Sequence, residues 1–250
     1  MRVLVTRPAA QASEWVQQLR AAGLQAEALP LIDIAAAPDG DALAAAWAAL
    51  PAQAMVVFVS PNAVTHFFAA KPEHTAWPVG VQAASPGPGT TKVLRGLGVP
   101  AIVEPAADAA QFDSESLWQQ LSTQEWAGQR VLVVRGTSGR DWLAERLRER
   151  GAELSFVAAY GRTAPHLSPA QQALLGEALA RPGEHLWFFS SSEAVAHLQA
   201  LAPQADWSQA LAVATHPRIA ESARRLGLGR VTEARPTLEA VVACIQSIAS

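Results

Sequence analysis

The chain contains one cysteine among 250 residues, so it can form no internal disulfide. That residue, Cys244, lies in an apolar helical pattern, where a buried and unreactive thiol is the common case. The sequence also has no run of about 18 apolar residues, the length that a membrane-spanning helix needs. Its first residues, MRVLVTRP, lack the features of a secretory signal. These absences predict a cytoplasmic protein that does not associate with membranes.

The signals of several other protein classes are missing too. Lysine and arginine number 19 against 22 acidic residues, with no basic run, so nucleic-acid binding is not expected. The six histidines show no metal-ligand spacing. No Gly-x-Gly-x-x-Gly follows a strand pattern, GPGTTK departs from the order of a P-loop, and the Gly-x-Ser-x-Gly turn of serine hydrolases is absent. We therefore predict no metal and no cofactor.

What the sequence does contain is an internal repeat. Residues 3–8 (VLVTRP) correspond to residues 131–136 (VLVVRG), at an offset of 128 residues. Farther on, residues 60–64 (SPNAV) correspond to residues 191–195 (SSEAV) at nearly the same offset. Matches in the same order at nearly constant spacing indicate a duplicated unit.

Within each copy, short apolar runs rich in β-branched residues alternate with helical patterns, as at 131–134 and 142–147. This alternation predicts an α/β protein of two similar lobes, each a parallel sheet flanked by helices. The pattern is interrupted near residues 30–38 and 158–165, at equivalent places in the two copies, by extended segments that contain proline. We predict that these segments form a two-segment linker between the lobes.

The segments that follow the predicted strands resemble one another, because they carry hydroxyl side chains, helix-starting turns and arginines. Ligands of parallel sheets bind beyond the carboxyl ends of the strands, where helix N-termini attract anions. Any one of these residues could be an ordinary helix cap, but together they favour a polyanionic ligand. The candidate binding residues are Thr6, Arg7, Ser60, Asn62, Gly89, Thr90, Arg135, Gly136, Arg140, Ser190, Ser191, Ser192, Thr215 and Arg218.

The single tyrosine of the chain, Tyr160, lies in the second linker segment, where the first copy has Ile32. Its ring could pack at the edge of a lobe with the hydroxyl in water. Alternatively, its phenol could donate a proton or a hydrogen bond to a leaving group. The residues alone leave both interpretations open.

Motifs along nearly the whole chain resemble those of the bacterial uroporphyrinogen-III synthase family. They are VLVTRP near the start, VFVSPNAV at 57–64, VLVVRGTSGRDWLAERLRERGAEL at 131–154, AYGR at 159–162, FFSSSEAV at 188–195 and ATHPRIAESARRLG at 214–227. One departure occurs at Ser85-Pro86, where the family usually has an apolar end to the strand.

The resemblance implies a monomeric lyase of heme biosynthesis that cyclises hydroxymethylbilane, a linear polycarboxylate, to uroporphyrinogen III. Water is lost, and the last pyrrole ring is inverted through a spiro intermediate. The resemblance also implies that Tyr160 is the catalytic donor, and it adds Ser114 to the candidate binding residues. It leaves open a transient contact with the upstream deaminase.

The resemblance implies a domain layout that the repeat does not show. One lobe would be discontinuous, with residues 1–36 and 164–250, and the other would contain residues 37–158. The site would lie in the cleft between them.

Two other functions remain compatible with the residues alone. A non-catalytic two-lobed cytosolic protein that binds a small carboxylate or phosphate would need the same donors at its strand ends. A glycosyltransferase-like enzyme would share the two lobes, but the sequence shows no acidic pair suited to a metal or a sugar nucleotide.

Overall fold

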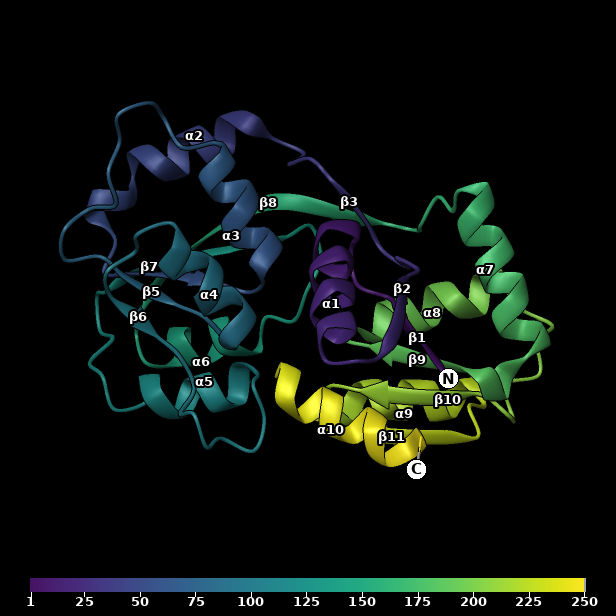
Figure 1. Ribbon diagram of the computed structural model, residues 1–250. Helices are drawn as coiled ribbons and strands as arrows, with labels where there is room; N and C mark the ends of the chain where they lie inside the picture. Colours follow the sequence, from purple (N-terminus) through teal and green to yellow (C-terminus); the bar gives the residue numbers. More distant parts are fainter. Residues whose placement is uncertain (250) are drawn as a thin grey trace. The chain divides into compact units, whose positions relative to one another are not determined.

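The computed structural model describes residues 1–249 and divides into two compact units. Unit 1 contains Met1–Ile34 and the chain from Thr163 onward, and unit 2 contains Ala35–Arg162. Both are drawn in Figure 1. In the described part of the chain, no helix combines the length and apolar character that a membrane crossing requires.

Unit 1 is built on a five-stranded parallel sheet with the strand order β11-β10-β9-β1-β2. Its strands are β1 (Arg2–Val5), β2 (Gln25–Ala28), β9 (His185–Phe189), β10 (Leu211–Ala214) and β11 (Arg230–Glu233). Its helices are α1 (Ala9–Ala21), α7 (Pro169–Ala180), α8 (Ser192–Leu201), α9 (Pro217–Leu226) and α10 (Leu238–Ala249), with a short 3-10 turn at Pro182–Glu184.

Both faces of the unit 1 sheet are covered, which explains why its central strands are apolar throughout. Leu186 and Phe188 of β9 pack against α1 and α10, whereas Trp187 and Phe189 pack against α7, α8 and α9. Because successive side chains of a strand point to opposite faces of the sheet, β9 contributes to the hydrophobic core on both faces.

The second sheet has six strands in the order β3-β8-β7-β4-β5-β6 and belongs to unit 2, except that Asp33 and Ile34 of β3 and Thr163 of β8 are counted with unit 1. Its strands are β3 (Asp33–Ala35), β4 (Met55–Phe58), β5 (Gln82–Ala84), β6 (Ile102–Val103), β7 (Arg130–Gly136) and β8 (Glu153–Thr163). The helices of unit 2 are α2 (Gly40–Ala48), α3 (Pro61–Ala69), α4 (Pro88–Gly96), α5 (Ser114–Leu121) and α6 (Trp142–Glu149), with a 3-10 turn at Leu50–Ala52. Helices α5 and α6 pack on one face of the sheet, while α3 lies on the other, where Phe58 meets Phe67.

The two sheets have the same strand order, because β6-β5-β4-β7-β8 matches β11-β10-β9-β1-β2 strand for strand at the repeat offset. The prediction of two similar parallel-sheet lobes is therefore confirmed. The copies are exchanged, however: unit 1 takes β1 and β2 from the first copy and β9, β10 and β11 from the second. The two segments interpreted as linkers contain β3 and the end of β8, which are neighbouring strands of one sheet.

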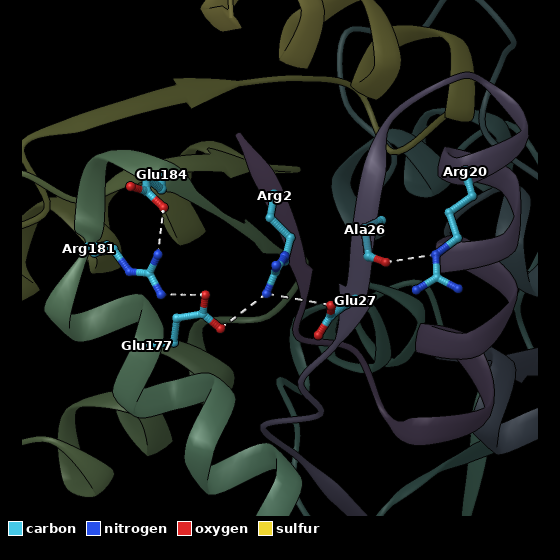
Figure 2. A network of polar contacts seen from close by, with 7 residues as sticks. All are labelled: Arg2, Arg20, Ala26, Glu27, Glu177, Arg181 and Glu184. Atoms are coloured by element: carbon cyan, nitrogen blue, oxygen red, sulfur yellow. Dashed lines mark hydrogen bonds and ion pairs between the residues drawn. The ribbon is translucent and has the colours of Figure 1, made fainter.

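Ion pairs close the amino end of the unit 1 sheet, as Figure 2 shows. Arg2 at the start of β1 lies 3.6 Å from the Glu27 carboxylate and 3.2 Å from that of Glu177 on α7. Arg181 donates to Glu177 at 2.8 Å and to Glu184 at 3.3 Å. Because opposite charges balance one another here, the unsatisfied helix N-termini at the other end of the sheet are the better place for an anion.

Candidate functional site

Three side chains of unit 2 form a hydrogen-bonded chain at the carboxyl end of its sheet. Ser60 directly precedes α3, and its Oγ accepts a hydrogen bond from the Ala63 N–H at 3.1 Å. The same Oγ lies 2.9 Å from the hydroxyl of Tyr160 on β8. Arg162 Nη2 donates to the Tyr160 hydroxyl at 2.9 Å. Sequence reasoning missed Arg162, although its place two residues after Tyr160 on one strand puts both on the same face.

A β-bulge turns Tyr160 toward α3. Arg135 of β7 pairs with Ala158, but the next residue, Gly136, pairs with Tyr160, so Ala159 is the extra residue. Such a bulge reverses the side-chain alternation and re-aims the residue that follows. The Tyr160 ring therefore lies near His66 of α3, with 5.9 Å between ring centroids.

Gly136 makes room for the tyrosine. A Cβ at Gly136 would lie 3.1 Å from Tyr160 Cζ, which is closer than side chains normally pack. Gly136 is itself buried. The absence of a side chain at Gly136 thus accommodates the phenol. The ligand contact that its position after a strand indicated stays a prediction.

The Tyr160 side chain is fully enclosed, with 0% of its surface exposed. The interpretation of a ring with its hydroxyl in water is wrong, since that hydroxyl contacts Ser60 and Arg162. Among the three residues, Ser60 and Arg162 retain partial exposure.

The other candidates of unit 2 differ in accessibility. Asn62 lies half-buried in the first turn of α3, and Gly89 lies exposed in the first turn of α4. Thr90 lies inside α4 and is only 4% exposed; the N-cap of this helix is Gly87, not a threonine. Ser114 is the first residue of α5, after the capping Asp113, and stays half-buried.

Two candidate arginines of unit 2 have carboxylate partners. Arg140 donates two hydrogen bonds to Glu115, both at 2.9 Å, and Arg135 pairs with Asp141. The Arg140 hydrogen bonds hold the pKa of the Glu115 carboxyl below its usual range, and the pKa of Arg140 is raised by the same contact. Neither arginine therefore offers an uncompensated charge to an anion.

The Glu115 contact predicts a pH-dependent stability. The folded state favours the Glu115 carboxylate, so its contribution is complete above the unfolded pKa and is lost as the pH falls through the lower folded pKa. We expect Glu115→Gln to cost about 0.5–1 kcal/mol at pH 7, the range of an exposed ion pair, and less at pH 3, where the carboxyl is partly or fully protonated. Urea unfolding at both pH values measures this difference, with Glu125→Gln as an exposed control. An equal cost at both pH values would exclude the ion pair as its source.

A cavity of about 430 Å³ lies beside Arg135. Its lining residues are Arg135, Gly136, Thr137, Asp141, Phe156 and Ala158. The Arg135 guanidinium lies over the Phe156 ring, 5.6 Å from its centroid, and Phe156 remains 43% exposed. Sequence reasoning missed this aromatic residue, because one phenylalanine in a strand usually indicates core.

In unit 1, β1 ends in two candidates with different roles. The Thr6 hydroxyl donates to the Phe188 carbonyl at 2.8 Å and is 1% exposed, so it joins β1 to β9 and is not presented to a ligand. Arg7 lies over Trp15 at 5.2 Å and donates to Gln11. Burial lowers the pKa of Arg7 to about 10, and its buried Nε has no hydrogen-bond partner among residues 1–249.

The remaining candidates lie where β9 and β10 end. Ser191 caps α8 and accepts from the Glu193 N–H, and Ser190 precedes it, half-buried. The exposed Ser192 hydroxyl donates to the Arg218 carbonyl at 3.4 Å. At α9, His216 is the cap, because its Nδ1 accepts from the Arg218 N–H. Thr215 is 7% exposed and lies beneath this turn.

Within the described residues, no group of three acidic, histidine or cysteine side chains could hold a metal ion. The structure thus assembles the candidates in two sets, one at the carboxyl edge of each sheet. Unit 2 holds the phenol, serine and guanidinium chain, and unit 1 holds helix caps with Arg7.

Comparisons with known proteins agree on one family. The profile of the family described as "Uroporphyrinogen-III synthase HemD" matches residues 13–243. The uroporphyrinogen-III synthase of Salmonella typhimurium is 34% identical over 175 residues, which cover 70% of each chain. That of Synechococcus elongatus is 33% identical over 214 residues, or 82% of this chain and 77% of the relative.

Solved structures show the same fold. A uroporphyrinogen III synthase structure from Thermus thermophilus matches 100% of this chain and 97% of its own, with a TM-score of 0.61 and 18% identity. That from Helicobacter pylori matches 99% of this chain and 100% of its own, with a TM-score of 0.58 and 18% identity. With the profile match and the sequence relatives, these findings show that the chain belongs to the uroporphyrinogen-III synthase family.

Proposed function

We propose that this protein is a cytoplasmic lyase that cyclises hydroxymethylbilane to uroporphyrinogen III. Family membership supports the activity, since relatives at 33–34% identity carry the name of this enzyme. The observation that carries the proposal is the chain of Arg162, Tyr160 and Ser60 at the carboxyl end of a parallel sheet, where ligands of such sheets bind.

The reaction requires few general acids or bases from the protein. When the hydroxymethyl C–O bond breaks, its electron pair stays with the oxygen, which takes up a proton and leaves as water. The lone pair of the pyrrole nitrogen stabilises the remaining cation. The last ring then attacks through its substituted carbon, the spiro intermediate fragments, and the macrocycle closes inverted with loss of a proton from ring carbon. One hydrogen-bond donor at the leaving oxygen and a fixed substrate conformation are the main requirements.

Donors at the strand ends suit a polycarboxylate substrate. Helix N-termini with Ser60 and Ser191 as caps present backbone N–H groups that favour negative charge. Arg7 adds a guanidinium whose Nε lacks a partner among the described residues, and a carboxylate could satisfy it. We assign substrate binding to these groups and the exposed Arg218, acting in a monomer without metal or cofactor.

A coupled assay tests the function. Porphobilinogen and its deaminase generate hydroxymethylbilane in the presence of this protein, and the oxidised products are separated by isomer. We expect the III isomer well above the background of spontaneously formed I isomer. A non-catalytic carboxylate-binding protein would leave the product entirely as the I isomer, and that result would refute the proposal. Omitting the deaminase gives the blank.

A further inference from the structure

We propose that the Ser60 hydroxyl, and not that of Tyr160, touches the departing hydroxyl of the substrate. Arg162 is then a positioning residue that sets the direction of a hydrogen-bond chain running from Arg162 through Tyr160 to Ser60. The identity of the leaving group rests on the proposed function. The direction of the chain rests on the contacts alone.

The direction follows from donors and acceptors. A guanidinium can only donate, so the Arg162 contact makes the Tyr160 oxygen an acceptor. If Ser60 also donated to this oxygen, the phenol proton would have no acceptor in a fully buried site, which is costly. The contacts of Tyr160 offer one acceptor for that proton, the Ser60 Oγ at 2.9 Å. Tyr160 therefore donates to Ser60.

The proton that remains available belongs to Ser60. Its Oγ already accepts from the Tyr160 hydroxyl and from the Ala63 N–H, so both lone pairs are used. Its own O–H has no partner within residues 1–249, and Ser60 is partly exposed whereas Tyr160 is not. The chain thus presents a serine hydroxyl that can only donate.

Tyr160 and Arg162 make this serine a better donor. Hydrogen bonds in a chain polarise one another. The hydrogen bond that Tyr160 donates to Ser60 therefore strengthens the hydrogen bond that Ser60 donates to the leaving oxygen of the substrate. If the proton moves, it passes from Ser60 to the leaving oxygen while the Tyr160 proton passes to Ser60. The resulting phenolate lies 2.9 Å from the Arg162 guanidinium, which compensates its charge. The proton released from ring carbon at closure restores the phenol.

The repeat counterpart shows that this arrangement is peculiar to unit 2. Ser191 caps α8 as Ser60 caps α3, but Ile32 stands at the position equivalent to Tyr160 and is buried among apolar side chains. The unit 1 cap thus has no phenol behind it. This difference between Ile32 and Tyr160 means that, among the residues that the structure describes, only unit 2 has a serine cap that accepts a hydrogen bond from a phenol.

A double-mutant cycle on kcat for the III isomer tests whether Tyr160 acts through Ser60. We expect Ser60→Ala to lower kcat at least as much as Tyr160→Phe, and the double variant to match Ser60→Ala within about threefold. If Tyr160→Phe lowers kcat by the same factor with and without Ser60, the phenol donates directly and the inference fails. Ser168→Ala, which removes a helix cap from α7 of unit 1, is the control for cap loss and should keep the parental kcat.

The Arg162 role is tested by Arg162→Met and Arg162→Lys. We expect Met to lower kcat about tenfold with KM nearly unchanged, the lower end of what a lost charged hydrogen bond costs, and Lys to recover most of the loss. A parental kcat in Arg162→Met would overturn the positioning role.

A spectroscopic test of the direction needs neither a variant nor activity. Tyr160 is the only tyrosine, so the Raman doublet of phenol rings, which differs between donating and accepting hydroxyls, reports this residue alone. We expect the signature of a hydroxyl that both accepts and donates. A purely accepting hydroxyl would refute the direction. A wild-type protein with the expected doublet but no III isomer would refute the proposed function and leave the direction intact.

Discussion

Replacement of Tyr160 by phenylalanine is expected to lower the rate of uroporphyrinogen III formation by roughly 10- to 1,000-fold. The substitution removes only the hydroxyl, so Ser60 loses the donor behind it and Arg162 loses an acceptor. General-acid assistance is typically worth about 10² to 10⁴ in rate. The lower part of that range and below applies here, because a hydroxymethylpyrrole already ionises readily. Folding of the substrate is assigned to other groups, so the product should remain the III isomer.

Initial rates with separated isomers measure this effect. The matched control is Trp126→Phe, which removes another buried donor of unit 2, the indole N–H that bonds to the Leu121 carbonyl at 2.8 Å. Both variants should lose about 1–2 kcal/mol of unfolding free energy through an unmade buried hydrogen bond, but only Tyr160→Phe should lose rate. Equal rates for Tyr160→Phe and the parent would leave the tyrosine with a packing role. A change to the I isomer would show that it orients the last ring.

Replacement of Gly229 by alanine is expected to destabilise unit 1 by about 3 kcal/mol or more, at or above the upper end of overpacking costs. A Cβ at Gly229 would overlap the Ser208 carbonyl oxygen and lie 2.8 Å from its carbonyl carbon, and no rotamer change can move these backbone atoms. The Gly229 N–H also bonds to the Trp207 carbonyl, and Trp207 packs edge-on against Trp187 in the core. Relief of the overlap must therefore displace a core tryptophan or break that hydrogen bond.

Urea unfolding followed by tryptophan fluorescence measures this loss. Gly176→Ala is the control, since nothing lies within 4 Å of a Cβ at this position inside α7. Alanine is the better helix former by about 0.5–1 kcal/mol, so the control should be slightly stabilised. If the two alanine variants unfold at the same urea concentration, the close approach at Gly229 does not constrain the fold.

The fold was predictable because its signals are local or repeated. Alternation of apolar runs and helical patterns requires only neighbouring residues, and the match of residues 3–8 with 131–136 makes two sheets of one design. The exchange of the copies between the units was not readable from the repeat. The local strand and helix contacts would be the same whether each unit were made of one copy or of strands from both copies. Only contacts between residues distant in the sequence distinguish the two arrangements.

For the candidate site, the helix caps could be predicted from the sequence, but the direction of individual side chains could not. Ser60 and Ser191 are caps, as their place before a helix indicated. Thr6 has the same type of position but turns its hydroxyl to the Phe188 carbonyl, since a threonine at a strand end can bond a neighbouring strand as well as a helix. A one-residue β-bulge directs the Tyr160 side chain toward Ser60. Bulges have no unambiguous sequence signature, so this orientation could not be predicted.

The exchange of the copies also affects the order in which the two units can fold during synthesis. Unit 2 is continuous and has its whole chain once Arg162 has been made. Strand β1, by contrast, is made first but pairs with β9, which begins at His185. At about 5 to 20 residues per second, β1 waits on the order of 10 to 40 s for this partner. During that time its Val3, Leu4 and Val5, all buried in the finished protein, have only β2 and α1 to cover them. Strand β1 therefore leaves apolar side chains without their β9 partner during that time, whereas unit 2 can form all of its contacts before unit 1 is complete.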